Sequence, residues 1–490
     1  LQIMQDWCNK NKLEIAKDKS ALMPMYVRKK EEYISHPTVK AWDFKIVSKM
    51  KYLGVMLDSK MDWYPHILYL ENKVTHIRNS LVRCSRTTWG ISYSHLMTIY
   101  NRAILPVILY AAEAWSVSTS QRARLKLRQI QRSFLIFATK AYRTVSNNAL
   151  QAIACAMPID PAIHLHNDIR AISRGQATNA VIPILKRTEI PTRSKGIHPK
   201  DNHIDIDTSG MVGKAEILIF TDGSKTESHV GTGMVAMENS KEIFTGIRRL
   251  DLECSVFQAE LLGIYIATEW IEQQKKVTSS YAIHVDSKAA LFATANRKTT
   301  HPLAVQIREK IITLKKSNTI TLHWVKGHAG LGGNERADYL AKISASHKST
   351  LDYTSIPITR SKQLLTEHYN TIWNSIYTRS NDASHTKHFI PNIPHRMSLS
   401  IWPNHMTTQF LTNHGRFQSY LHRMHIRASP LCNCPEKPPQ TALHLITECS
   451  NFSRDRPPVL HSAPLPMVLK THFNTVAVAE FLKNIFRTLV

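Results

Sequence analysis

The chain has few cysteines and no long apolar run. Seven cysteines are spread over 490 residues, and an odd, sparse set argues against a disulfide framework and for a reducing environment. The most apolar stretch, residues 103–115, is too short to cross a bilayer and contains Pro106 and Glu113. We therefore expect no transmembrane span and a location inside the cell, nuclear or cytoplasmic or both.

Acidic residues are scarce as well. The chain has 63 Lys and Arg against 37 Asp and Glu, a net charge of +26. Most of this excess lies in residues 1–200, and no acid occurs between Glu113 and Asp160. Such a balance indicates a polyanionic partner, because neutralising phosphates releases counterions and drives binding. Histones, ribosomal proteins and membrane-surface proteins are also basic, so charge alone does not choose among polyanions.

The pattern of the chain predicts several segments. The sequence begins at Leu1 with residues typical of a domain interior, so we expect a piece of a longer protein without a signal peptide. Residues 1–60 read as mixed strand and helix, with a strand at 51–57. Residues 61–187 have a mainly helical period, and residues 188–214, rich in Pro, Gly, Asp and Ser, read as a linker.

Residues 215–348 alternate between strand and helix patterns. We expect strands at 217–221, 231–237, 242–248, 281–286 and 320–325. We expect helices at 256–274, 287–296, 303–316 and 334–345. Three successive strands followed by alternating helices and strands predict a mixed five-stranded α/β sheet with flanking helices.

Four acids stand where this fold can bring them together: Asp222, Glu260, Asp286 and Asp338. Taken singly, they are explained by a turn, a solvated helix face, an N-cap and a surface position. Four independent accidents in this order are a poor explanation. Clustered carboxylates repel one another without a cation and are the ligands that hard divalent ions prefer. The set therefore predicts two Mg²⁺ ions, or Mn²⁺, for phosphodiester hydrolysis.

The motifs around these acids resemble type 1 ribonuclease H. They are Thr-Asp-Gly-Ser at 221–224, Gln-Ala-Glu-Leu at 258–261, Val-Asp-Ser at 285–287, His-Trp-Val-Lys-Gly-His at 323–328 and Gly-Asn-Glu-Arg-Ala-Asp at 333–338. The resemblance implies cleavage of the RNA strand of an RNA–DNA hybrid. It implies that Asp222 bridges both ions, that Glu260 and Asp286 complete one site, and that Asp338 binds the other. It further implies that His328 assists proton transfer or product departure and that Ser224 contacts nucleic acid.

Hybrid binding needs help from outside this block. Only residues 296–302 join the two middle helices, so the basic protrusion of some cellular enzymes is absent. We expect residues 121–143 to form a helix with one apolar side and a row of cations. For an isolated helix, a solvated basic face is an even alternative. In so basic a chain, we favour contact with a nucleic-acid backbone through Arg122, Arg124, Lys126, Arg128 and Arg132.

A second metal site is predicted near the C-terminus. Cys432, Cys434, His444 and Cys449 form a Cys-Cys-His-Cys set within residues 430–455, and thiolates with imidazole suit Zn²⁺. The Cys-x-Cys start is shorter than the usual two to four intervening residues, and chance clustering is the alternative. Residues 349–429 are a less regular connecting region, and residues 456–490 a tail with a final helix.

The flanking regions resemble a non-LTR retrotransposon polyprotein of the arthropod style. Tyr-Leu-Gly-Val-Met-Leu-Asp at 52–58 resembles the end of a reverse-transcriptase palm, and Tyr-Ala-Ala-Glu-Ala-Trp at 110–115 its thumb. Residues 413–423 resemble the tail of such elements. No Ala-Asp-Asp tract occurs, so we expect the polymerase active site to be absent from this chain. The alternative to a ribonuclease is a non-catalytic nucleic-acid-binding remnant, and the oligomeric state is open.

Overall fold

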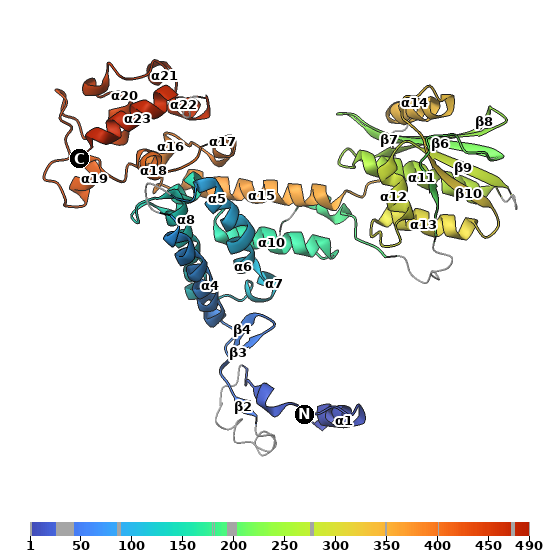
Figure 1. Cartoon of the computed structure of the whole chain (residues 1–490), viewed down its shortest axis with the longest axis horizontal. Coiled ribbons are helices and arrows are strands. Elements are labelled where there is room, and N and C mark those ends of the chain that lie inside the picture. The colour runs from blue at the N-terminus through green and yellow to red at the C-terminus, as the bar shows by residue number, and fades with distance from the viewer. Residues whose placement is uncertain are drawn as a thin grey trace. The chain divides into compact units, whose positions relative to one another are not determined.

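The computed structural model describes the chain in two compact units, 1–167 with 368–490, and 168–367. The residues described are 2–25, 44–85, 90–178, 180, 182–193, 203–274, 279–347, 350–399, 401–471 and 476–489. Within these ranges, no helix has the length and apolar character needed to cross a membrane. The two units are coloured by residue number in Figure 1, and each is treated separately below.

The unit of residues 168–367 contains a mixed six-stranded sheet. Its strands are β5 (Ile206–Asp207), β6 (Ile217–Lys225), β7 (Val230–Glu238), β8 (Lys241–Leu250), β9 (Ser280–Val285) and β10 (Thr319–Trp324). The order is β5-β10-β9-β6-β7-β8, with the first four strands parallel and the last two antiparallel to their neighbours. The mixed sheet is as predicted, but the count of five strands was wrong. The sixth strand, β5, is too short to leave a pattern in the sequence.

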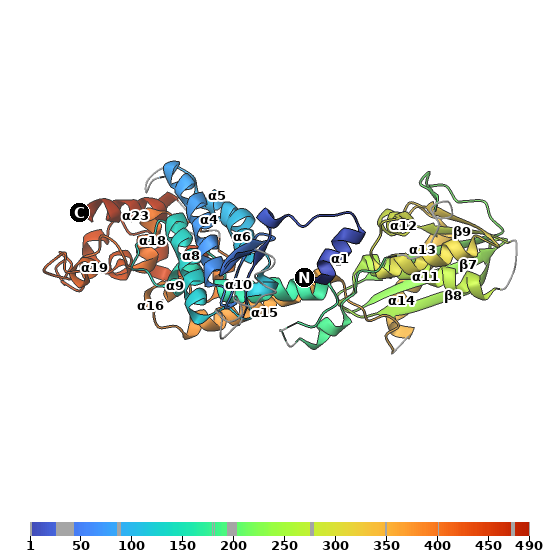
Figure 2. The ribbon, with the colours of Figure 1, turned by 90° about the horizontal axis from the view of Figure 1, so that it is seen from below.

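Helices cover both faces of this sheet. They are α11 (Val256–Gln273), α12 (Lys288–Ala295), α13 (Pro302–Leu314) and α14 (Gly332–His347). Figure 1 shows α14 on one side of the strands and the other three helices on the opposite side. The two neighbouring residues Ile219 and Phe220 point to opposite faces, because side chains alternate along a strand. Ile219 lies in the core beneath α11 and α13, which run side by side in Figure 2, whereas Phe220 packs with Ala337 and Leu340 of α14.

Two segments outside the predicted domain pack on this sheet. Residues 182–193 contain the 3-10 helix η3 (Pro183–Arg187), and Thr188 pairs with Ile356 in an isolated bridge. A second bridge joins Leu250 to Tyr353. Parts of the predicted linker 188–214 and of the connecting region are therefore folded against the sheet. Their pairing is long-range, so composition alone could not reveal it.

The other unit is mainly helical around one apolar core. Its N-terminal helices are α1 (Gln2–Lys10), α4 (Tyr64–Arg83), α5 (Tyr93–Ile99), the π-helix η2 (Tyr100–Ile104), α6 (Leu105–Leu109), α7 (Ala112–Trp115), α8 (Gln121–Thr139) and α9 (Asn147–Ile153). The helix α10 (Ile159–Ser173) continues into the second unit. Buried Ile67, Leu96, Trp115 and Phe134 belong to this core. The helical period predicted for residues 61–187 is thus present.

The expected strand at 51–57 is a hairpin instead. β3 (Lys49–Tyr52) and β4 (Val55–Asp58) pair antiparallel. The turn between them consists of Leu53 and Gly54, with φ of 44° and 85°. Positive φ at both turn residues matches the twist of a two-residue hairpin. The apolar run conceals this turn because Leu53, and not Asn or Asp, occupies its first position. Upstream, the two-residue strands β1 (Ala21–Leu22) and β2 (Lys45–Ile46) pair in parallel.

The C-terminal part shares the core of the N-terminal helices. The helix α15 (Ile358–Arg379) runs from the sheet unit into this unit. It is followed by α16 (Ser384–Lys387), α17 (Ile393–Met397), α18 (His405–Thr412), α19 (Gln418–Arg423), α20 (Ala442–Thr447), η5 (Ser450–Phe452), α21 (Val459–Ser462), α22 (Leu465–Thr471) and α23 (Val476–Thr488). The cysteines Cys432, Cys434 and Cys449 lie in the same buried cluster as Phe134. The predicted zinc region is therefore part of a larger core.

Candidate metal centre and active site

Three of the four predicted carboxylates meet at one edge of the sheet. Asp222 lies within β6, Glu260 on the second turn of α11, and Asp286 directly after β9. Each offers an oxygen, and these three oxygens lie within 4.8 Å of one another. Gly223 permits this approach, since a Cβ there would lie 2.6 Å from the backbone nitrogen of Glu260. The Asp-Gly pair is therefore a packing requirement between strand and helix.

The three acids are destabilised as anions. Burial, and then the charges of neighbouring carboxylates, raise the pKa of Asp222 to about 7 and the pKa of Glu260 to about 9. Burial also raises the pKa of Asp286. The Oε2 atom of Glu260 is buried without a hydrogen-bond partner. A divalent cation would satisfy that oxygen and offset the repulsion, so the residues fit Mg²⁺ or Mn²⁺.

Asp338 stands slightly apart from this group. It lies on the second turn of α14, and its carboxylate accepts from the ammonium of Lys342 at 2.7 Å. Asp338 is not one of the residues whose oxygens lie within 4.8 Å of one another. Its charge nevertheless raises the pKa of Asp222 and Asp286. The structure thus brings three predicted ligands together and keeps the fourth nearby, paired with a lysine.

His328 lies on the loop between β10 and α14. Its side chain is exposed and its φ is 54°. The loop comes close to the carboxylate cluster, because a Cβ on Gly327 would lie 2.9 Å from Oδ2 of Asp286. The charge of His328 lowers the pKa of Asp286, against the stronger effect of burial. The histidine is therefore within electrostatic reach of the candidate site.

Two residues beside the cluster were missed from the sequence. The indole of Trp324 donates to the backbone oxygen of Asp286 at 2.9 Å, and the ammonium of Lys288 lies 3.8 Å from the centre of that ring system. Trp324 thereby fixes the end of β9, where Asp286 follows. Trp324 could have been singled out from the sequence, because it lies in the His-Trp-Val-Lys-Gly-His motif. The role of Lys288 could not, because its contact with Trp324 depends on the fold.

The predicted zinc ligands are also brought together. Cys432, Cys434, His444 and Cys449 are all buried, with ligand atoms within 4.8 Å of one another. The two Sγ atoms of Cys432 and Cys449 are 3.8 Å apart, and Sγ of Cys434 is 3.4 Å from Nε2 of His444. Burial raises the pKa of the Cys434 and Cys449 thiols. The donor set fits Zn²⁺, which binds thiolates and imidazole together.

Most of the cationic side chains on helix α8 that were expected to bind nucleic acid contact other residues of the same unit. Arg124 is exposed. The other four predicted nucleic-acid contacts on this helix have partners within the unit. Arg122 lies over the Tyr64 ring at 3.9 Å, Lys126 pairs with Glu71 at 2.9 Å, and Arg128 pairs with Asp160 at 2.7 Å. Arg132 donates to Asn147 Oδ1 at 2.6 Å and to the backbone oxygens of Arg143 and Val145. Ser224, on β6, is half-buried. The assignment of these residues to nucleic acid stays a prediction.

A further basic cluster on the same unit was not foreseen. The ammonium groups of Lys51 and Lys73 lie 5.2 and 4.7 Å from the centre of the Tyr69 ring. Tyr69 and Lys73 are four residues apart on α4, so the sequence already places them on the same helix face. Lys51 comes from the β3–β4 hairpin, so its part in the cluster needed the fold. Aromatic rings among cations are typical of surfaces that contact nucleic acids.

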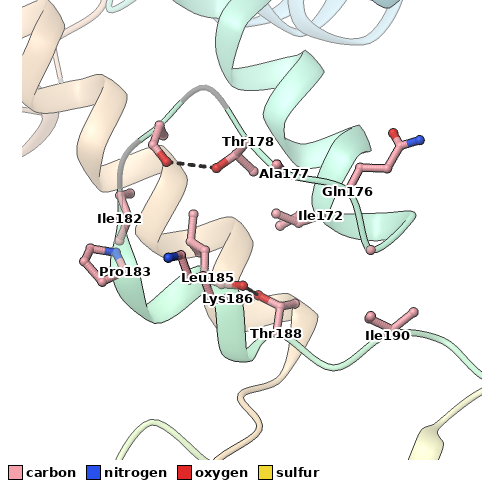
Figure 3. Close-up of a pocket in the computed structure, with 12 residues that line it drawn as sticks. Ile172, Gln176, Ala177, Thr178, Ile182, Pro183, Leu185, Lys186, Thr188 and Ile190 are labelled. Carbon is pink, nitrogen blue, oxygen red and sulfur yellow. Dashed lines mark hydrogen bonds between the residues drawn. The ribbon is translucent and has the colours of Figure 1, made fainter.

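A separate pocket in the sheet unit lacks such chemistry. It is lined by apolar side chains, among them Ile172, Leu185 and Ile190 (Figure 3). Thr178 donates to the backbone oxygen of Ala180 at 2.9 Å at its rim. Among the described lining residues, Lys186 is the one charged side chain. The carboxylate cluster is therefore the better candidate for a reaction site.

Comparison with known proteins identifies the class to which this fold and site belong. Residues 214–346 match the family described as RNase H. The chain is 31% identical over 102 residues to a ribonuclease H of Buchnera aphidicola, covering 19% of this chain and 67% of that protein. The chain therefore belongs to the ribonuclease H family through this domain.

The same comparison relates the chain to retrotransposon proteins. It is 30% identical over 110 residues to the Retrovirus-related Pol polyprotein from type-1 retrotransposable element R1 4 of Nasonia vitripennis, covering 22% of this chain and 28% of that protein. It is 24% identical over 199 residues to the R1 2 polyprotein of the same organism, covering 40% and 48%. The chain thus spans less than half of the length of either relative.

Proposed function

We propose that this chain hydrolyses the RNA strand of RNA–DNA hybrids with divalent metal ions, as part of a retrotransposon reverse-transcription protein. The observation that carries the proposal is the cluster of buried Asp222, buried Glu260 and half-buried Asp286, with oxygens within 4.8 Å. Two buried acids and a half-buried third, all with raised pKa values, are unfavourable in a merely structural role. The relatives named ribonuclease H and Pol polyprotein support the substrate and the context.

The four carboxylates are proposed to bind different metal ions according to their positions. Two divalent ions, when bound, would activate the attacking water and stabilise the leaving oxygen. Asp222 interacts electrostatically with both Asp286 and Asp338 and is the proposed shared ligand. Glu260 and Asp286 are proposed to complete one site. Asp338 would serve the other site after leaving Lys342, which lies 2.7 Å from it. The fixed backbones of β6, β9 and α11 hold the first three oxygens in place.

His328 is proposed to move a proton near the departing product. It is exposed on a loop that contains Gly327 and Gly330, the latter at φ 78° with open space around it. An exposed imidazole on such a loop can reach the site and return to solvent. An imidazole ring has two nitrogens, so one group can both donate and accept a proton.

We propose that cationic side chains outside the carboxylate cluster bind the RNA–DNA hybrid. Arg124 on α8, together with Lys51 and Lys73 around Tyr69, offers charge and an aromatic face for a nucleic-acid backbone. Arg122, Lys126, Arg128 and Arg132 share their charge with internal partners. Within these 490 residues no Ala-Asp-Asp tract occurs, so we assign the chain no polymerase activity.

Zn²⁺ is proposed at Cys432, Cys434, His444 and Cys449 in a structural role. All four ligands are buried and belong to the elements that close the apolar core. A closed set of four protein ligands leaves no position for substrate and is typical of structural zinc. Buried Arg456 donates to the backbone oxygens of Ile446 and Cys449 at 2.9 and 2.8 Å. Its charge offsets the net negative charge of three thiolates.

A substrate panel tests the proposed function. The chain, with Mg²⁺ in excess, is incubated with one RNA strand paired to DNA, paired to RNA, or unpaired, and with the matching DNA duplex. We expect cleavage of the RNA in the hybrid alone, leaving the DNA strand intact. Binding of the hybrid without cleavage would instead favour a non-catalytic nucleic-acid-binding role. Equal cleavage of unpaired RNA would reject hybrid specificity.

A further inference from the structure

A buried carboxylate lies beside the N-terminal turn of α11. It belongs to a residue outside 214–346, the range that matches the ribonuclease H family. Glu189 is 7% exposed. Its Oε1 accepts from Nε2 of Gln258 at 2.5 Å and from the hydroxyl of Tyr353 at 2.6 Å. Its Oε2 lies 3.3 Å from Nε2 of His301. Burying a carboxylate is costly unless donors surround it, and here donors from three separate segments do so.

Gln258 connects this carboxylate to the start of α11. Its side-chain oxygen accepts from the backbone nitrogen of Ser255 at 2.9 Å, and the Ser255 hydroxyl accepts from the backbone nitrogen of Gln258 at 3.2 Å. This reciprocal pair is a capping box, which satisfies the free amides of a helix start. The amide nitrogen of Gln258 points the other way, to Glu189 and to the backbone oxygen of Ser355 at 3.0 Å. Glu189 therefore favours the amide orientation that closes the box.

Further pairs tie both flanking segments to the same corner. On one side, Arg187 contacts Asp251 at 2.6 Å. On the other, Asp352 accepts from the backbone nitrogen of Arg249 at 2.9 Å, and Arg360 pairs with Glu253. Residues 187–189 and 352–360, here called the flanking clamp, thus hold the junction between β8 and α11. Glu260 lies on α11 only two residues after Gln258.

We propose that Glu189 is a positioning residue for Glu260. Through Gln258 it fixes the first turn of α11, and that turn sets the carboxylate of Glu260 against Asp222 and Asp286. The inference rests on the proposed function, because it assigns Glu260 to a metal site. It adds that the nuclease requires the flanking clamp as well as residues 214–346.

Variants of the full chain test this positioning role. Glu189→Ala removes the acceptor, Glu189→Gln keeps an acceptor oxygen, and Tyr353→Phe removes one donor while keeping the ring. Glu216→Gln, an exposed acid just before β6, is the matched control. One readout is amide hydrogen exchange in residues 256–260. The other is the Mg²⁺ concentration that gives half-maximal hybrid cleavage.

We expect Glu189→Ala to speed exchange locally and to raise the required Mg²⁺ concentration about 10-fold, the lower end of the effect of removing a group that orients a metal ligand. Glu189→Gln and Tyr353→Phe should show smaller shifts, and Glu216→Gln none. Unchanged Mg²⁺ dependence in Glu189→Ala, or faster exchange spread evenly over the whole sheet unit, would overturn the positioning role. If the wild type cleaves no hybrid, the proposed function fails, and Mn²⁺ binding followed by electron paramagnetic resonance measures the same shift.

Discussion

The ammonium of Lys342 lies 2.7 Å from Oδ2 of Asp338, one helical turn earlier on α14. Asp338 is the one predicted carboxylate outside the group whose oxygens lie within 4.8 Å. Lys342 is more than half exposed, and exposed pairs at this spacing are weak. A divalent ion can therefore displace the lysine, and the two cations compete for one carboxylate.

This competition predicts the effect of Lys342→Met. Removing the ammonium leaves Asp338 available, so the Mg²⁺ concentration for half-maximal hybrid cleavage should fall about two-fold, as expected for losing one weak helix pair. Lys316→Met, at an exposed position just after α13, is the control and should leave the titration unchanged. A higher Mg²⁺ requirement in Lys342→Met would contradict competition and indicate that the lysine assists the site.

The raised carboxyl pKa values predict how stability depends on pH. Without metal, the pKa of Asp222 is about 7 and that of Glu260 about 9, against about 4 for ordinary carboxyls. Such groups bind protons more tightly in the folded chain, so their stabilising effect is present at low pH and lost as pH rises through the folded values. We expect the free energy of unfolding of the magnesium-free chain to fall between about pH 4 and 9.

Asp286→Asn is the internal control for this pH effect. The Asp286 charge raises the pKa of both Asp222 and Glu260, so its removal should flatten the fall. Mg²⁺ binding displaces protons, so stabilisation by added Mg²⁺ should grow with pH in the wild type. Urea unfolding at a series of pH values measures both effects. Identical slopes for wild type and Asp286→Asn would show that the cluster does not control them.

The zinc proposal predicts a metal content that depends on Cys434. Cys434→Ser should lower bound zinc well below one ion per chain and destabilise the helical unit, because the cysteines lie in its core. Cys84→Ser, at an exposed cysteine, should keep the wild-type content. Metal content is measured after dialysis by atomic emission. A wild-type chain purified with added zinc that retains none would reject the site.

The contacts on α8 predict different effects for two arginines. Arg124 is exposed, so Arg124→Gln should weaken hybrid binding and reduce the slope of log affinity against log salt by about one. Arg132 donates to two backbone oxygens and to Asn147, so Arg132→Gln should mainly lower thermal stability. Binding titrations at several salt concentrations distinguish them. An unchanged slope in Arg124→Gln would remove this helix from the nucleic-acid surface.

Local pattern predicted the parts of the site that lie on regular elements. The acids of β6, α11 and the end of β9 stood in readable motifs, and the structure brings them together. The pairing of Asp338 with Lys342 follows from their four-residue spacing on α14, but the separation of Asp338 from the other three carboxylates depends on the fold. Five residues spaced four apart on α15 are all buried: Ser361, Leu365, Tyr369, Trp373 and Tyr377. They form a narrow buried stripe on an otherwise polar helix, so the overall composition of this region did not reveal it.

The contacts of Glu189 could not be predicted from the sequence. Its partners Gln258, His301 and Tyr353 are separated from it by long stretches of chain, and its neighbours read as linker. The strand β5 has only two residues and acquires its conformation from pairing with β10. In both cases tertiary contacts, and not local preference, determine the structure.

Hybrid cleavage by wild type and Asp286→Asn tests the central claim most directly. A hybrid labelled on its RNA strand is incubated with each protein and Mg²⁺ under single-turnover conditions, after both have been shown to bind it equally. We predict cleavage by the wild type and a loss of at least about 100-fold in rate for Asp286→Asn, since a cation ligand at the reacting phosphate is removed. Equal cleavage by the two proteins would contradict the assignment of the carboxylate cluster as the active site.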